Sequence, residues 1–235
     1  ILEKGESESW FESRTINMMA GLCVIGLGGF IWRELTTAQP VVNLKIFGNR
    51  IFALSTMFNM VSGFGLFTSV FVYPILVQRI NGWSATETGL SLMYPTFLGV
   101  LLFPMIGRYL SKGGKPIPLM AMGIFIFIIY GFIGGSVTTD MGRWEFFPMQ
   151  IVRVLGVALL QMPLLNQAVA GLEQKDYPAG IALSNMLRQL GGAFGIAMAN
   201  NYATTRSGQH RVDLLANFQP ENPALIQRVQ GMAAN

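Results

Sequence analysis

Charged side chains are scarce in this sequence of 235 residues, and the negatively charged ones, 12 Asp and Glu, are fewer than the 16 Lys and Arg. Charged residues make up 12% of the chain, whereas a soluble domain carries about 25%. The charge-free stretches approach or exceed the ~17–25 apolar residues that cross a bilayer as a helix. There are six of them: 15–32, 51–78, 88–107, 117–139, 154–172 and 189–205. No soluble fold accounts for six such runs, and the alternation typical of a spanning β-strand is absent.

The residue types that build enzyme and metal sites are equally rare. Cys23 is the only cysteine, which excludes a disulfide within the chain, and His210 is the only histidine. No nucleophile–base pair, metal-ligand cluster or phosphate-binding loop is present. We therefore expect no enzyme activity, no cofactor and no metal. The net charge of +4 is modest and its basic residues lie between the apolar runs, which does not indicate a nucleic-acid partner.

Carboxylates are expected only in loops and at the termini, outside the spans. Proton coupling across a membrane normally uses a titratable Asp, Glu or His within it. If this protein moves protons, we expect the coupling carboxylate to lie outside residues 1–235.

These patterns predict an all-α fold, a polytopic membrane bundle of about six spans. The basic residues of short loops indicate which loops are cytoplasmic. The loops after the first, third and fifth spans hold most of them: Arg33, Lys45, Arg50, Arg108, Lys112, Lys115 and Lys175. The loops after the second and fourth spans hold only Arg79 and Arg143. The rule therefore places residues 1–15 and 206–235 outside.

Single polar residues on the apolar runs are the candidate site. Arg188 and Asn185 share one face of the sixth predicted span (180–206), Arg153 and Gln161 share one face of the fifth (146–172), and Asn59 lies on the second. Converging polar faces form the midplane cavities of transporters. The alternative is that these groups hydrogen-bond across helices as packing contacts, and that Arg153 extends toward the interface. The G-x-x-x-G at Gly131 and Gly135 predicts close helix packing.

Several stretches of this sequence resemble the major facilitator superfamily (MFS), and in particular its drug:proton antiporters with fourteen spans, the EmrB/QacA type. The stretches are YPILVQRINGWSATETGL (73–90), RVLGVALLQMPL (153–164) and SNMLRQLGGAFG (184–195). The flanks of the first apolar run, LEKGESESWF (2–11) and RELTTAQPVVNLKIF (33–47), resemble those of the second extra central helix of that family.

The resemblance implies a domain organisation. Residues 1–50 would hold an external segment, the extra central helix and a cytoplasmic linker. Residues 51–205 would form five core spans of the C-terminal bundle, and 206–235 the external loop before the last span. The family's cytoplasmic loop motif would correspond to Gly107, Arg108, Lys112, Gly114 and Lys115, with Ser111 in place of the acidic residue. Positive-inside anchoring is the alternative role for the two lysines.

The resemblance also implies a function, namely export of hydrophobic or amphipathic drugs by proton-coupled alternating access in the bacterial cytoplasmic (inner) membrane. The N-terminal half of the same chain would complete the cavity, and two-membrane bacteria would add a periplasmic adaptor and an outer-membrane channel. The cavity or gating residues would be Arg188, Arg153, Gln161, Asn59 and Asn185. Two alternatives stay open: a transporter of the same fold for another solute, such as a metabolite or siderophore, and a non-transporting membrane assembly module.

Overall fold

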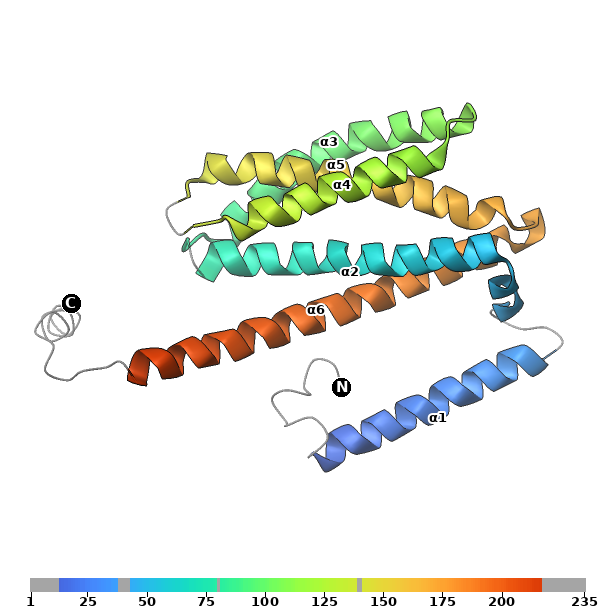
Figure 1. Cartoon of the computed structure of the whole chain (residues 1–235), viewed down its shortest axis with the longest axis horizontal. Helices are drawn as coiled ribbons and strands as arrows, with labels where there is room; N and C mark the ends of the chain where they lie inside the picture. Colours follow the sequence, from blue (N-terminus) through green and yellow to red (C-terminus); the bar gives the residue numbers. More distant parts are fainter. Residues whose placement is uncertain (1–12, 38–42, 80, 139–140, 217–235) are drawn as a thin grey trace, which may run out of the picture. The chain divides into compact units, whose positions relative to one another are not determined.

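The fold is a set of long helices. A computed structural model describes residues 13–37, 43–79, 81–138 and 141–216, without the side chains of residues 143, 211 and 213–216. The helices follow one another in the order shown in Figure 1: α1 (Arg14–Thr36), the 3-10 helix η2 (Leu44–Gly48), α2 (Arg50–Arg79), α3 (Ala85–Ser111), α4 (Pro116–Gly135), α5 (Arg143–Ala170), η3 (Gln174–Asp176) and α6 (Tyr177–Ala216). The predicted terminal segments at 1–12 and 217–235 lie outside the described residues.

Five of these helices, α1 to α5, are long and apolar enough to cross a membrane. The all-α, multi-pass prediction is therefore confirmed. The sixth predicted run is helical, but α6 is not among the five, because Asn185, Arg188 and Gln189 lower its hydropathy. Helix α6 also continues past the predicted end at 206, to Ala216. Its last residues belong to a separate compact unit, 198–235, while all packing described below lies within 1–197.

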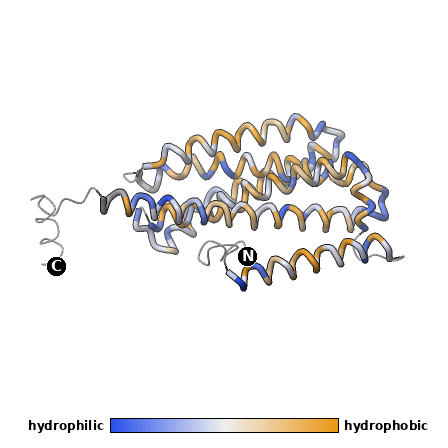
Figure 2. The backbone as a smooth tube through the Cα atoms, turned by 60° about the horizontal axis from the view of Figure 1, so that its bottom comes forward, coloured by the Kyte–Doolittle hydropathy of each residue, from blue (hydrophilic) through white to orange (hydrophobic). Residues whose placement is uncertain are grey.

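The outer faces of the helices expose large apolar side chains, whose contact with water would be unfavourable. Ile25 and Trp32 on α1 are 73% and 72% exposed, and Phe132 on α4 is 79% exposed. Figure 2 shows hydrophobic residues along the helices and hydrophilic residues gathered at their ends. Contiguous exposed apolar surface of this extent marks contact with lipid or with further protein.

Helix α5 packs against α2, α3 and α4. Its approach to α4 depends on a pair of glycines. A Cβ added at Gly123 would lie 2.9 Å from the backbone nitrogen of Leu160, and one added at Gly156 would lie 3.1 Å from that of Phe127. Only residues without a side chain allow two backbones to approach this closely.

The predicted G-x-x-x-G packing is not what brings α4 and α5 together. A Cβ at Gly131 or Gly135 would meet no atom of the described residues within 4 Å. These two glycines lie on a face of α4 that no described helix covers. The contact instead uses Gly123, which lies outside the G-x-x-x-G pattern.

Small residues also join α2 to α6. A Cβ at Gly63 would overlap the carbonyl oxygen of Arg188, and one at Gly191 would overlap that of Met60. Beside this seam, the Asn59 side-chain amide on α2 donates to the Ser184 hydroxyl at 2.7 Å and to the Ser184 carbonyl oxygen at 3.2 Å. The backbone of α6 is thereby held against α2 at the level of Arg188.

The connections gather at two ends of the helices, as an up-and-down path requires. At one end, Ile46 of η2 packs with Phe52, Ala168 and Leu183, so the linker after α1 contacts the start of α2, the end of α5 and the start of α6. At the other end, the Asn81 side-chain amide after α2 donates to the Met141 carbonyl oxygen before α5, at 3.2 Å. The two contacts lie at opposite ends of α2 and α5.

One expectation about carboxylates is wrong. Glu34 does not lie in a loop: it is in the last turn of α1, and its side chain is only 6% exposed. Glu87 and Glu145 lie in the first turns of α3 and α5, where each accepts a hydrogen bond from a backbone N–H of its own helix start. These carboxylates are at helix ends, so the middle of each described span still carries none.

Candidate functional site

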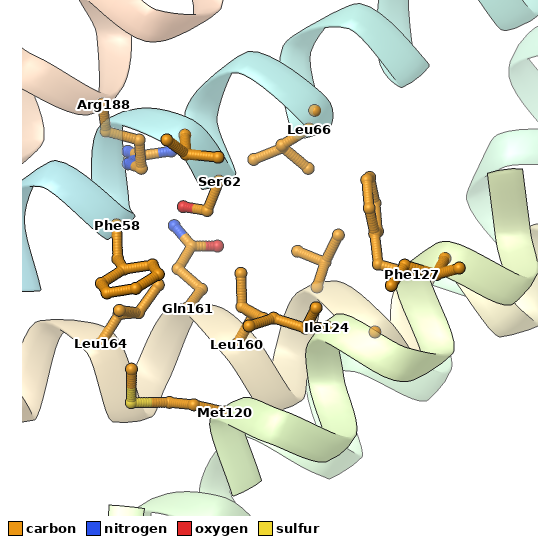
Figure 3. A pocket seen from close by; sticks show the side chains of 15 residues that line it. Phe58, Ser62, Leu66, Met120, Ile124, Phe127, Leu160, Gln161, Leu164 and Arg188 are labelled. Carbon is orange, nitrogen blue, oxygen red and sulfur yellow. The ribbon is translucent and has the colours of Figure 1, made fainter. Parts of the chain in front are cut away.

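A cavity of about 300 Å³ lies among α2, α4, α5 and α6. Its wall is mostly aliphatic and aromatic, with side chains such as Phe58, Leu66, Ile124, Phe127 and Leu160 shown in Figure 3. The polar groups in the wall come from Ser62, Gln161 and Arg188. An apolar cavity with a few convergent polar groups is the usual form of a small-molecule site.

Arg188 is the one charged residue of this wall. Its Nη2 lies 3.5 Å from the Asn185 side-chain oxygen, at the outer limit of a hydrogen bond, and its guanidinium carbon lies 5.7 Å from the centre of the Phe67 ring. Its Nε is buried and has no hydrogen-bond partner among the described residues. A guanidinium so weakly paired in an apolar wall keeps hydrogen-bonding capacity for a ligand or for another protein segment.

Ser62 and Gln161 complete the polar part of the wall. In Figure 3 the side chains of Ser62, Gln161 and Arg188 point toward one another across the space between α2, α5 and α6. The Ser62 hydroxyl donates to the Asn59 carbonyl oxygen at 2.8 Å, which fixes its position on α2. Val157, one turn before Gln161 on α5, lines the same cavity.

The remaining two predicted cavity residues lie elsewhere. Asn59 is 2% exposed and bonds to Ser184, so it joins α2 to α6 and does not line the cavity. Arg153 is 7% exposed, and its Nε donates to the Gln150 side-chain oxygen at 2.7 Å. The structure therefore brings Arg188, Gln161 and, through its hydrogen bond, Asn185 to one cavity.

Arg153 belongs to a second buried polar group. Tyr73 on α2 and Tyr130 on α4 pack in one buried cluster with Phe146 and Met149, which precede Arg153 on α5 by two turns and one turn. The Tyr73 hydroxyl lies 2.9 Å from the Ser91 hydroxyl of α3. Four helices thus meet at a polar centre that includes no carboxylate among these residues. Sequence reasoning missed the two tyrosines, because tyrosine on a span is ordinary at a membrane interface.

The predicted cytoplasmic loop motif is a tight connection between α3 and α4. Gly107 and Arg108 lie in the last turns of α3, Lys112 is its C-cap, and Lys115 is the N-cap of α4. Arg108 and Lys112 are exposed, and the Gly114 N–H donates to the Tyr109 carbonyl oxygen at 3.0 Å. The residue that needs a left-handed backbone is Gly113, with φ of 85°, which the motif does not include.

Taken together, these observations define a multi-pass α-helical membrane protein with a sparsely polar cavity between its helices. No family model matches the chain. It is, however, 27% identical to the multidrug export protein EmrB of Escherichia coli over 99% of its length and 46% of EmrB. It is 25% identical to the uncharacterized MFS-type transporter YhcA of Bacillus subtilis over 98% of its length and 44% of YhcA.

A third relative is the lincomycin resistance protein LmrB of Listeria monocytogenes, 28% identical over 82% of this chain and 41% of LmrB. These relatives are an MFS-type transporter, a multidrug export protein and a lincomycin resistance protein, and the resemblance predicted from the sequence is confirmed. MFS transporters are not enzymes. The chain spans less than half the length of these relatives.

Proposed function

We propose that this chain is the C-terminal bundle of a drug exporter that works by alternating access, with the Arg188 cavity as part of its substrate site. The observation that carries the proposal is the cavity itself. Its wall is apolar apart from Ser62, Gln161 and one weakly paired guanidinium. Such a wall accepts varied hydrophobic compounds and fixes their polar ends at few points. The names of the relatives, multidrug export and lincomycin resistance, support it.

The rest of the transporter follows from the same proposal. The remaining wall of the cavity, and the carboxylate that couples proton entry to export, would come from the N-terminal half of the same chain. Helix packing through glycines at Gly63 and Gly191 supports rigid-body rocking, because a close backbone contact moves as one unit. The loop between α3 and α4, with Arg108, Lys112 and Lys115, would face the cytoplasm in an inner membrane.

The roles of Asn59 and Arg153 are proposed differently from that of Arg188. Asn59 would hold α2 and α6 in register, since it is buried and bonded to Ser184 across the two helices. Arg153 would support the packing of α5, since it is buried and its hydrogen bond to Gln150 lies within that helix. A periplasmic adaptor and an outer-membrane channel would complete the route in a two-membrane organism. That part of the proposal derives from the family resemblance alone.

The test is dye efflux from vesicles that contain the complete protein, with Arg188→Ala, Arg188→Lys and Arg206→Ala compared at equal protein content. Loss of a charge-assisted contact worth ~1.4 kcal/mol lowers efflux about tenfold. We expect that loss in Arg188→Ala, partial recovery in Arg188→Lys, and wild-type efflux in Arg206→Ala, which removes an exposed arginine of the same helix.

Wild-type efflux in Arg188→Ala contradicts the role given to the cavity. Absence of dye movement in the wild-type protein contradicts drug export itself. Flux of a metabolite or siderophore in the same vesicles would then identify a transporter of another solute, and the absence of any solute flux would identify an assembly module.

A further inference from the structure

The ring of Phe127, on α4, forms one end of the Arg188 cavity. Figure 3 shows Phe127 and Arg188 at opposite ends of the lining, with Ser62 and Gln161 nearer to Arg188. The far side of the Phe127 ring is occupied by packed protein: its centroid lies 5.5 Å from that of Tyr130, and it packs against the buried cluster to which Tyr130 belongs. The cavity therefore ends at this ring.

We propose that Phe127 determines the specificity of the Arg188 cavity by limiting the length of the apolar part of the molecule that binds there. This limit rests on the proposed function, because it concerns what the same cavity accepts for export. A ligand whose polar end meets Arg188 and Gln161 has its apolar part directed toward Phe127. Gly156, which contacts Phe127, precedes Gln161 by five positions on α5, or about 7.5 Å along the helix axis.

Two glycines hold Phe127 in this position, and both line the cavity. A Cβ added at Gly156 of α5 would lie 3.1 Å from the Phe127 backbone nitrogen and 3.3 Å from its Cα, so the backbone of α4 rests on α5 here. A Cβ added at Gly65 of α2 would lie 2.8 Å from Cε1 of Phe127, so the edge of the ring rests on the α2 backbone. The side chain thus extends from the α5 contact to α2 and closes the space between them.

The small size of the cavity makes one ring decisive. Its volume of about 300 Å³ lies at the lower end of the ~300–1,000 Å³ typical of small-molecule sites. In a hydrophobic pocket of fixed shape, one methylene changes discrimination between ligands by about 10–200-fold. Replacing the Phe127 ring by a shorter apolar side chain should therefore admit ligands that the wild-type cavity excludes.

The chain offers two substitutions with opposite effects on ligand size. Phe127→Leu shortens the side chain and lengthens the cavity toward Tyr130. Gly65→Ala shortens the cavity, because its methyl group enters the same wall and displaces the edge of the Phe127 ring. Both substitutions disturb packing, so a role for Phe127 in stability alone does not predict effects of opposite sign. Phe125→Leu is the control: it makes the same change on α4 at a side chain that is 64% exposed and does not line the cavity.

The reporter is a single thiol in the cavity wall, introduced by Ser62→Cys in the complete protein after Cys23 and any other cysteine have been replaced by serine. Arg188 points toward this position, which favours the reactive thiolate. Alkylation rates with N-methylmaleimide and N-benzylmaleimide are measured in detergent by intact mass. Both reagents react through the same ring, so the ratio of the two rates cancels changes in thiol reactivity and reports the space available to the larger group.

We expect Phe127→Leu to raise the benzyl-to-methyl rate ratio about tenfold, Gly65→Ala to lower it about threefold, and Phe125→Leu to leave it unchanged. Adding Phe127→Leu to Gly65→Ala should restore the ratio, because the shorter side chain avoids the added methyl group. An unchanged ratio in Phe127→Leu overturns the proposal. An equal rise in Phe125→Leu also overturns it, since that would mean a general loosening of α4. A ratio that stays low in the double variant would show that the ring does not set the limit.

The labelling ratio does not depend on transport. A raised ratio in Phe127→Leu, together with absent dye efflux in the wild-type protein, upholds the size limit and contradicts the exporter. An unchanged ratio together with efflux that depends on Arg188 upholds the exporter and contradicts the size limit.

Discussion

The contact between α4 and α5 can be tested by a single methyl group at Gly123. A Cβ there would lie 2.9 Å from the Leu160 nitrogen, 3.0 Å from the Leu159 carbonyl carbon and 3.1 Å from the Gly156 oxygen, whereas ordinary Cβ contacts begin at 3.4 Å. All three atoms belong to the backbone of α5, so no side chain can rotate away. In Gly123→Ala, the two helices must therefore separate by several tenths of an ångström. Overpacking of this kind costs about 1–3 kcal/mol.

The same helix supplies the control. Gly131→Ala adds the same methyl group to α4 at a position with no described atom within 4 Å. Both substitutions gain the same ~1 kcal/mol of helix propensity, so their difference isolates the clash. Thermal unfolding of the complete protein in detergent measures it. At about 2–4 °C per kcal/mol, the Tm of Gly123→Ala should be roughly 2–12 °C below that of Gly131→Ala.

Equal Tm values for the two variants would refute the reasoning, because they would mean that α4 and α5 are not in backbone contact at Gly123. A lower Tm in Gly131→Ala would also contradict it, and would show that the G-x-x-x-G face of α4 packs against a segment outside this chain.

Two further predictions concern the α2–α6 seam and the cytoplasmic loop. In a double-mutant cycle on unfolding, Asn59→Ala and Ser184→Ala should couple by about 0.6–1.7 kcal/mol, the range of hydrogen bonds between membrane helices, and additive effects would show that the bond is not formed. Gly113→Ala should destabilise the protein by about 1–2 kcal/mol, because an L-residue resists a positive φ. Gly107→Ala, in a helix with open space around it, should not, and equal unfolding free energies for the two would contradict the turn.

The helices could be predicted because lipid and backbone chemistry leave few options. A chain that crosses a bilayer must satisfy its own N–H and C=O groups, so each charge-free run has to be helical. The residues at which the helices end were harder to predict. Helix α6 continues to Ala216 because nothing between 206 and 216 stops it, neither proline nor a charge pattern that favours a turn. Glu34 was expected in a loop because a carboxylate near the end of an apolar run normally marks the first residue outside the span. In the structure it lies in the last turn of α1.

The sequence predicts which polar residues share a face of one helix, but not which residues of other helices they contact. Helical periodicity places Arg188 with Asn185, and the structure shows that pair in contact. Periodicity also places Arg153 on the face of Gln161, yet the two arginines of the spans end in different environments, because α5 contacts α2 and α4 along its length and meets different residues at each level. The sequence of each helix determines which of its faces carries polar residues. Which of these faces meet depends on the register between the helices. Here that register is set by Gly63, Gly123, Gly156 and Gly191, whose missing side chains fix how closely and at what level the helices meet. A glycine on a span does not indicate which helix it packs against. The residues that line the cavity therefore could not be predicted from the sequence alone.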